Sequence, residues 1–436
     1  MDKKETIRGF SRMSREEKIQ HVIEHVGLSE DLKQDLDRYL HPSEQTLFNN
    51  ISENTVSNYY LPYSLAPNFL INDTMYIIPM VIEESSVVAA ASKAASFWAK
   101  NGGFKTRIIN VEKNGQIFFS WAGTVDDLKP YSKELEILIN KVTESATANM
   151  RSRGGGITSF EIKSIDNMPN THQLLVKFKT GDSMGANFIN TCLEIISPEL
   201  IHFINSKDEL KRHGNAKSIM SILSNYTPNC LVECQVSCPI EQLKPYAGEF
   251  STQEFAQRFK QAVDIAINDP YRATTHNKGI FNGIDAVVLA TGNDFRAIEA
   301  GAQAYASHNG QYSSLTKLEL SATEFTYTLE VPLALGTVGG LTNVHPMVKA
   351  SLEILNQPSA EQLMQITAAA GLANNFGAVA ALVTTGIQKG HMKLHLSNIL
   401  TSMNTTDEER EKANEYFKNE TVSYSGVENF LKSLRN

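Results

Sequence analysis

The sequence predicts an α+β fold of several domains: a large mixed α/β domain, a small antiparallel-sheet domain inserted into it, and a C-terminal helical flap. Its 436 residues hold about two or three domains at roughly 150 residues each. The pattern changes to alternating, strand-like segments after Phe104 and changes back after about Ser218. Beyond Gly390 the chain combines capped polar helices with few large apolar groups. The expected parts are a large domain over 1–105 and 219–388, a small domain over 106–218, and a flap over 389–436.

Composition and charge narrow the class of protein. With 42% hydrophobic residues, 20% charged residues and 14 prolines, the chain has the composition of a folded globular protein. A formal net charge of −8 creates no overall field that attracts nucleic acid or an anionic membrane. Residues 1–20 are charged throughout, and no later stretch approaches the ~20 apolar residues that a membrane span needs. We expect a soluble, cytoplasmic protein that binds neither nucleic acid nor membrane.

The first part of the chain combines helix and strand patterns. The expected elements are a polar amphipathic helix over 14–40, extended segments over 61–72 and 75–84, and a small-residue helix over 85–103. Ser85 or Ser86 caps the last of these helices and Gly102 ends it. Glu84 therefore lies at a strand-to-helix junction.

The small domain follows a ββαββα order, which predicts one antiparallel sheet with helices on a face. The expected elements are strands over 106–112 and 116–122, an amphipathic helix from about Val125 to Met150, strands over 157–165 and 172–180, and a helix after GDSMGAN (181–187). Lys113, Asn114 and Gly115 predict a hairpin turn between the first two strands.

The later part of the large domain is expected to contain strands through Cys238 and a helix from Ser251, in which Glu254 completes a capping box. Residues 316–335 alternate as a hairpin does, and helices continue through about Gln388.

The spacing of the cysteines and histidines allows two interpretations, a metal site or buried structural side chains. Cys230, Cys234 and Cys238 alternate with Val232 and Val236, so an extended strand places all five on one face, as in a buried apolar stripe. No CxxC pair or nearby histidine pair supports zinc instead. Two histidine pairs have helical spacing without an evident third ligand: His21 with His25, and His391 with His395. We expect no metal.

Nucleotide binding requires an unusual site, because no GxGxxG follows a strand and no P-loop motif occurs. In GDSMGAN, Gly185 and Ala186 let a ligand approach the backbone at a helix start, where free N–H groups favour a diphosphate. An ordinary Gly/Ala helix packed on a sheet explains the same motif.

Four residues have side chains suited to carbonyl chemistry. Lys278 lies in a polar, glycine-bearing loop before a buried run, and Asp294 lies near the start of the next helix. A lysine beside a carboxylate can stabilise an oxyanion, although a structural salt bridge fits the residue types equally well. Likewise, Glu84 fits a solvated helix-start acid and His391 fits a surface residue.

Five segments together resemble one family, the soluble class II hydroxymethylglutaryl-CoA reductases. In chain order they are ENTVS, IPMVIEESSVVAAAS, GDSMGAN, DPYRATTHNKGIFNGIDAVVLATGND and GIQKGHM. The resemblance extends from about Gly9 to Leu400, and its block from Lys278 to Asp294 is highly specific.

The resemblance implies a reductive deacylation, in which two hydrides from a nicotinamide cofactor convert 3-hydroxy-3-methylglutaryl-CoA through mevaldehyde to mevalonate and CoA. It implies that Glu84 donates a proton to the carbonyl oxygen and that Lys278 stabilises that oxygen as hydride arrives. Asp294 would lie between them and couple their protonation. His391, on a hinged flap, would protonate the departing CoA thiolate.

The resemblance also implies binding residues and an assembly. The hydroxymethylglutaryl pocket would be lined by Arg272, Ser86, Thr275 and Asn282, with Arg12 reaching the CoA phosphates. Cofactor contacts would come from Asp182, Met184, Gly185, Ala186, Asn187, Gly155, Gly156 and Ser159. The active sites would be shared across a homodimer, with a higher oligomer left open.

Two departures from the family pattern affect the placement of Glu84. Ser85 replaces a proline that would preset the backbone at the helix start, and Ser57 stands where a glycine is common. For the cofactor, Ser159 stands near a position where some NADH-using relatives have an acid. With Arg151, Arg153 and Lys163 nearby, Ser159 tolerates a 2′-phosphate, so NADPH is favoured and NADH stays possible.

Two other functional classes compete with a reductase. An acyltransferase or hydrolase needs a Cys or Ser nucleophile beside a His, and the cysteine stripe is expected to be buried. A catalytically inactive binding module is expected to have lost one of the four reacting side chains, and all four are present.

Overall fold

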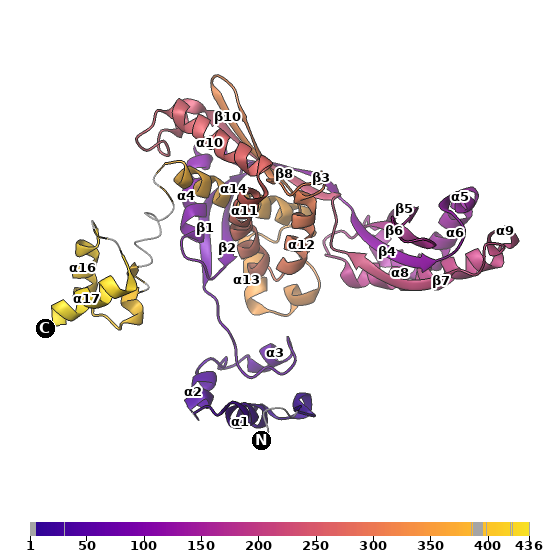
Figure 1. Ribbon diagram of the computed structural model, residues 1–436, viewed down its shortest axis with the longest axis horizontal. Coiled ribbons are helices and arrows are strands. Elements are labelled where there is room, and N and C mark those ends of the chain that lie inside the picture. Colours follow the sequence, from indigo (N-terminus) through magenta and orange to yellow (C-terminus); the bar gives the residue numbers. More distant parts are fainter. Residues whose placement is uncertain are drawn as a thin grey trace. The chain divides into compact units, whose positions relative to one another are not determined.

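A computed structural model of the chain describes residues 6–29, 31–384, 386, 396–397, 399–418, 420 and 422–435. The chain divides into two compact units, Met1–Pro62 and Tyr63–Asn436 (Figure 1). Sequence reasoning did not separate the first unit. No helix among the described residues is long and apolar enough to cross a membrane.

The N-terminal unit is helical. Its elements are η1 (Phe10–Arg12), α1 (Arg15–Val26), α2 (Asp31–Arg38) and α3 (Gln45–Asn49). The single helix expected over 14–40 is wrong: Gly27 adopts a φ of 77° and its N–H donates to the carbonyl of Ile23, which ends α1. Ser14 and Glu17 form a reciprocal capping box at its start.

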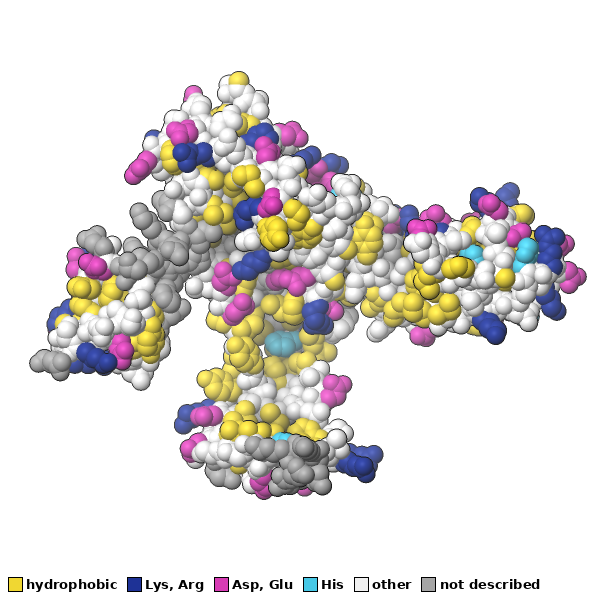
Figure 2. Space-filling model, viewed as in Figure 1, with side chains coloured by type: hydrophobic (Ala, Val, Ile, Leu, Met, Phe, Trp, Pro, Cys, Tyr) yellow, Lys and Arg dark blue, Asp and Glu magenta, His cyan; other side chains and the backbone are white. Residues whose placement is uncertain are grey.

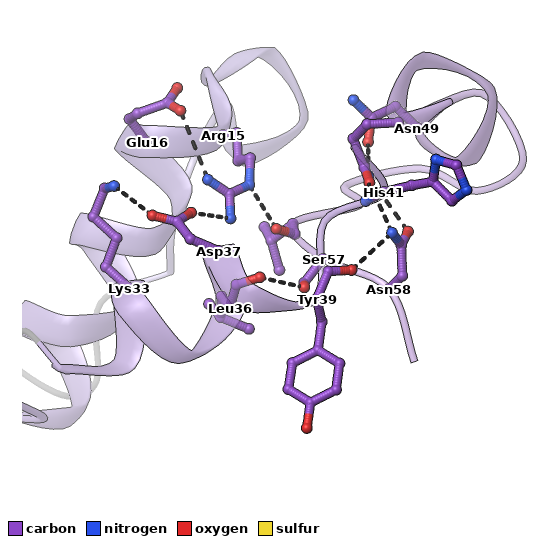
Figure 3. Close-up of polar contacts among 12 residues, drawn as sticks. Arg15, Glu16, Lys33, Leu36, Asp37, Tyr39, His41, Asn49, Ser57 and Asn58 are labelled. Atoms are coloured by element: carbon purple, nitrogen blue, oxygen red, sulfur yellow. Dashed lines mark hydrogen bonds and ion pairs between the residues drawn. The ribbon is translucent and has the colours of Figure 1, made fainter. Parts of the chain in front are cut away.

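Figure 3 shows how the segment after α3 is held to α1 and α2. The Ser57 hydroxyl donates to the carbonyl of Leu36 at 2.6 Å. Arg15 Nε donates to the carbonyl of Val56 at 2.6 Å, and its guanidinium pairs with Asp37 at 2.7 Å. Ser57 is not among the residues with positive φ. The serine therefore needs none of glycine's conformational freedom here, and its hydroxyl forms a bond that glycine cannot make.

The second unit contains all ten strands described. They are β1 (Tyr63–Ile71), β2 (Thr74–Val81), β3 (Lys105–Val111), β4 (Lys113–Ser120), β5 (Gly156–Ser164), β6 (Thr171–Lys179), β7 (Lys217–Ser224), β8 (Cys230–Pro239), β9 (Thr316–Leu320) and β10 (Glu324–Pro332). They form three antiparallel sheets, ordered β1-β2, β3-β8-β10-β9 and β5-β6-β4-β7. The α+β fold class, with a separate small antiparallel sheet, is confirmed.

The helices and 3-10 turns of the second unit are α4 (Val87–Ala99), α5 (Val125–Leu128), η2 (Lys129–Tyr131), α6 (Ser132–Val142), α7 (Glu144–Arg151), α8 (Ala186–Ser206), α9 (Asp208–Lys211), η3 (Ile240–Leu243), α10 (Thr252–Asn268), α11 (Pro270–Ala290), α12 (Phe295–Ala306), η4 (Gly340–Asn343), α13 (Pro346–Ile354), α14 (Ala360–Leu382), α16 (Asp407–Tyr416) and α17 (Tyr424–Arg435).

The main core forms around α14, which is buried on nearly all sides. Helices α4 and α11 pack against α14, and β1 and β2 pack against α4 and α11 respectively (Figure 1). Phe376 of α14 lies in an aromatic cluster with Phe97 and Trp98 of α4 and with Phe259 of α10. This packing brings the start of α4 close to the middle of α11, and the candidate site lies where these two segments meet.

The small sheet has a separate core beneath α8. The hairpin expected at residues 113–115 is wrong, because these residues begin β4, while β3 pairs with β8 of the other sheet. A Cβ on Gly115 would lie 2.7 Å from Leu193 Cδ1, so this glycine allows α8 to approach the sheet. The helix expected over 125–150 is likewise divided into α5, η2, α6 and α7.

The structure also tests the expected hairpin, the cysteine stripe and the flap. The hairpin over 316–335 is confirmed as β9 and β10, and Cys230, Cys234 and Cys238 are buried along β8. The flap is not poor in apolar packing, since its described residues form their own core. That core comprises Leu396, Ile399, Leu400, Ala413, Phe417, Val422, Val427 and Leu431. The predicted domain boundaries stay a prediction.

On the face shown in Figure 2, Lys and Arg side chains lie among Asp and Glu side chains. Exposed apolar side chains also occur, including Leu65, Met75 and Ile77 on the two-stranded sheet.

Candidate active site

The centre of the site is an ion pair between two elements far apart in sequence. Lys278 Nζ donates to Glu84 Oε2, and the two side chains are 59% and 34% exposed. Glu84 lies in the turn between β2 and α4, and Lys278 lies in the middle of α11. The pair therefore presents a cation and a carboxylate together at a solvent-accessible position, where both can reach a ligand.

Lys278 lies in a helix, so the loop expected around it is wrong. Asp269 caps α11 by accepting from the N–H of Arg272 at 2.7 Å, and Pro270 occupies the first turn. At helical spacing, Arg272, Thr275 and Asn282 follow the same side of α11 as Lys278. Burial lowers the pKa of the Arg272 guanidinium, although the group stays half-buried and cationic.

A cavity of about 510 Å³ opens beside this pair. Three of the predicted site residues line it: Glu84, Ser86 and Asn282. It is also lined by the N-terminal half of α4, the C-terminal half of α14 and the loop around Tyr246. A cavity of this size suits a small organic ligand, and polar side chains such as Glu84, Lys93 and Asn282 in its wall can orient that ligand.

Two lining residues were missed by sequence reasoning. Lys93 is the one Lys or Arg among the described lining residues, and its Nζ lies 5.0 Å from the ring centroid of Tyr246. The Tyr246 hydroxyl is buried without a hydrogen-bond partner among the described residues, and burial raises its pKa. Lys93 follows Ser86 at a spacing of two helical turns, which is a signal that could have found it. Tyr246 lies in a loop and carries no such signal.

Asp294 begins the helix that follows α11. Its carboxylate accepts from the N–H groups of Arg296 and Ala297 at 3.1 and 3.2 Å, which confirms the expected position at a helix start. Among the described residues, no hydrogen bond or ion pair joins Asp294 to Glu84 or Lys278. Its place in the catalytic cluster stays a prediction.

The roles of two further predicted residues stay predictions. His391 lies outside the described residues. Arg12 ends η1 in the N-terminal unit and is exposed, and its contact with CoA phosphates stays a prediction.

The predicted cofactor segments meet at the end of β6. Gly185 precedes α8 at a φ of 90°, and a Cβ there would lie 2.4 Å from Thr180 Cγ2. A Cβ on Gly155 would lie 2.5 Å from the carbonyl oxygen of Lys179. Each glycine is therefore required by close approach to one of two adjacent residues, Gly185 to Thr180 and Gly155 to Lys179. Met184, Ala186 and Asn187 flank the start of α8, whose first-turn N–H groups suit an anion.

Ser159 lies on β5 and lines a second cavity of about 580 Å³ between that strand and helices α5 and α6. Lys129 and Lys133 line the same cavity. Gly156 begins β5 at a φ of 118°. Asp182 differs from the other predicted cofactor residues, because its carboxylate accepts from the N–H of Ala360 at the start of α14, at 2.8 Å.

A family model described as hydroxymethylglutaryl-coenzyme A reductase matches residues 14–396. The chain belongs to this family. The reductase of Archaeoglobus fulgidus is 38% identical over 413 residues, which cover 92% of this chain and 88% of that protein. A probable reductase of Borreliella burgdorferi is 32% identical over 378 residues, covering 86% and 84%.

Solved structures of the same reductase family agree with the fold. A class II reductase from Streptococcus pneumoniae, bound to NADPH in open conformations, superposes with a TM-score of 0.71 at 35% identity. The match covers 87% of this chain and 100% of that chain. A second structure of the enzyme from that organism has a TM-score of 0.72 at 34% identity and covers 99% of this chain. The resemblance found in the sequence is confirmed.

The cysteines of this reductase-family chain are not arranged as nucleophiles or metal ligands. Burial raises the pKa of the Cys230 thiol to about 11 and that of Cys238 to about 12. These groups are therefore held as thiols, whereas nucleophilic attack and metal binding use the thiolate. Among the described residues, no group of three His, Cys, Asp or Glu side chains could hold a metal ion.

Proposed function

We propose that this chain reduces 3-hydroxy-3-methylglutaryl-CoA to mevalonate and CoA, using two hydrides from NADPH. The observation that carries the proposal is the Lys278–Glu84 pair, of which Glu84 lines the 510 Å³ cavity, in a chain that belongs to the reductase family. The pair supplies the two things that reduction of a carbonyl needs, a positive charge for the developing oxyanion and an acid to protonate it.

The mechanism follows from the roles of these side chains. NADPH, when bound, supplies hydride to the carbonyl carbon. Lys278 stabilises the oxygen as its charge grows, and Glu84 delivers a proton to that oxygen, first to form a hemithioacetal from the thioester. Collapse of the hemithioacetal returns its hydroxyl proton to Glu84 and expels the CoA thiolate, which His391 protonates, and it leaves mevaldehyde. Lys278 and Glu84 then act on the aldehyde in the same way, with Asp294 coupling their protonation, and the product is mevalonate.

Substrate contacts are proposed from the faces that meet at the cavity. Ser86 and Asn282 line it, and Arg272 and Thr275 continue the same side of α11. Arg272 suits the substrate carboxylate, because a guanidinium binds a carboxylate through two parallel hydrogen bonds. Lys93 offers a positive charge within the cavity wall for an anionic part of the CoA ester.

The cofactor site is proposed at the start of α8 and the start of β5. Gly185 is the N-cap of α8, and the first-turn N–H groups of this helix suit a diphosphate, while Gly185 and Gly155 allow close packing against Thr180 and Lys179. Ser159 and the two lysines of the second cavity tolerate the 2′-phosphate that distinguishes NADPH from NADH. Met184, Ala186, Asn187 and Gly156 complete this proposed site, and no metal takes part.

The assembly and location are further parts of the proposal. The two-stranded sheet has Leu65, Met75 and Ile77 exposed, and such an apolar face supports a homodimer. The active sites would be shared between its subunits, with the flap carrying His391 closing over each site. Four free cysteines suit a reducing compartment, and we place the reaction in the cytoplasm.

The test is nucleotide oxidation by the purified protein. NADPH should be consumed when 3-hydroxy-3-methylglutaryl-CoA is added, and acetyl-CoA, which lacks the carboxylate, should give no oxidation. Mevalonate should be the product. Release of CoA without nucleotide oxidation would show a hydrolase and overturn the proposal.

A further inference from the structure

One short segment, Gly336–Val338, joins the loop before α8 to the turn before Asp294. We call this segment the clasp, and we call the loop over residues 182–185 the cofactor loop. On one side, the N–H groups of Thr337 and Val338 donate to the carbonyl of Asp182 at 2.8 and 3.3 Å. Ser183 also pairs with Val338 as an isolated parallel bridge. The clasp thus forms main-chain bonds with the loop that precedes α8.

On its other side, the clasp is held by the side-chain amide of Asn293. The N–H of Gly336 donates to Asn293 Oδ1 at 2.8 Å, and Asn293 Nδ2 donates to the carbonyl of Gly336 at 3.0 Å. The same Nδ2 lies 3.2 Å from Thr291 Oγ1, and Thr291 is fully buried. Two bonds to one residue, with a third contact behind them, fix the orientation of the amide.

The clasp packs closely against the cofactor loop at Gly336. A Cβ on Gly336 would lie 2.4 Å from the backbone nitrogen of Met184 and 3.2 Å from the carbonyl oxygen of Asp182. Only glycine fits at this distance, so any shift of Gly336 is passed to the cofactor loop. Asn293 directly precedes Asp294, the cap of α12, so the same amide also borders the predicted catalytic aspartate.

We propose that Asn293 is a positioning residue, which sets the place of the cofactor loop relative to Asp294 through the clasp. The inference rests on the proposed function, in which the start of α8 holds the nucleotide. Hydride transfer depends on the alignment of donor and acceptor, and a misplacement of about 1 Å costs on the order of 100-fold in rate. Asn293 contacts neither ligand in this account, so its loss should act on alignment.

The test is Asn293→Ala with a matched control. Asn205 makes the same pair of bonds to a single residue elsewhere: its Nδ2 donates to the carbonyl of Ala216 at 3.1 Å, and its Oδ1 accepts from the N–H of Ala216 at 2.7 Å. We expect kcat of Asn293→Ala to fall about 10-fold to 100-fold, with the KM for the CoA ester nearly unchanged. Asn205→Ala should keep its kcat while losing similar stability.

Two further variants separate positioning from folding. Asn293→Asp keeps the acceptor for the Gly336 N–H and should recover part of kcat. Gly336→Ala should lower kcat, and combining it with Asn293→Ala should cost less than the product of the two losses, because both act through the clasp. Unchanged kcat in Asn293→Ala, or fully multiplicative losses, would overturn the inference.

Amide hydrogen exchange keeps the two proposals distinguishable. Asn293→Ala should speed exchange at Thr337, Val338 and Met184, whereas Asn205→Ala should not. If the unmodified protein oxidises no NADPH, the proposed function fails, and faster exchange at Met184 still supports the coupling. Unchanged exchange there overturns the coupling by itself.

Discussion

Replacing Lys278 by alanine is expected to abolish most turnover while leaving the fold intact. Lys278 is 59% exposed, and its only ion pair among the described residues is with Glu84. Exposed ion pairs contribute about 0–1 kcal/mol to the free energy of unfolding. For a protein of this size, such a loss lowers Tm by no more than a few degrees. A structural salt bridge would therefore leave little trace in the variant.

The catalytic loss is expected to be much larger. A donor that stabilises a developing oxyanion contributes about 10²–10³-fold to kcat, which is roughly 3–4 kcal/mol of the activation barrier. The effect on catalysis thus exceeds the effect on stability by several-fold in free energy. Binding of the CoA ester should change little, because the charge matters most in the transition state.

The assay is steady-state NADPH oxidation, together with thermal unfolding and CoA-ester binding. Lys260→Ala is the matched control, since Lys260 pairs with Asp264 on α10 at 2.8 Å with similar partial exposure of both groups. The control should match Lys278→Ala in Tm and keep its kcat. Near-normal turnover in Lys278→Ala would remove this lysine from the mechanism.

Three other predictions test separate parts of the account. Ser159→Asp should lower kcat/KM for NADPH more than for NADH, through repulsion of the 2′-phosphate; an unmoved ratio would place that phosphate elsewhere. His391→Gln should keep far more activity on free mevaldehyde than on the thioester, because only the thioester expels CoA; equal fractional losses would leave His391 a structural role. Burial, and then the neighbouring Glu299, raises the pKa of Asp285 to about 8 from 3.8, so the native state holds a proton that the unfolded state releases. Stability from this group is full below pH ~4 and is lost as pH rises towards ~8, so Asp285→Asn should flatten the fall of Tm across this range, and an unchanged slope would contradict the assignment.

Local signals in the sequence predicted several helix starts and one hairpin. Gly185 at the start of α8, Asp294 at the start of α12 and the hairpin over 316–335 each depend on neighbouring residues alone, and each is found in the structure. Ser86 occupies the position before α4 as expected, but at a φ of 78° its side chain makes no cap hydrogen bond.

Non-local pairing was beyond such reasoning. Lys113 and Gly115 are residue types common in turns, but they do not form one. Strand β3 pairs instead with β8, more than a hundred residues later, and Gly115 allows α8 to pack closely on the sheet. The residues around Lys278 have the composition of a loop. They are nevertheless helical, because Asp269 caps α11 and α11 packs against α14. The Asn293–Gly336 contact joins segments 43 residues apart and has no periodic signal. Contacts of this kind are set by the whole fold, so one sequence does not reveal them.

The most direct test of the central claim is the ratio of NADPH oxidised to CoA thiol released, measured in one reaction with 3-hydroxy-3-methylglutaryl-CoA. Reduction of the thioester through mevaldehyde to mevalonate predicts two molecules of NADPH for each CoA. A ratio of one, with mevaldehyde accumulating, would show that the second reduction does not occur at this site. Thiol release without nucleotide oxidation would contradict the assignment of a reductase altogether.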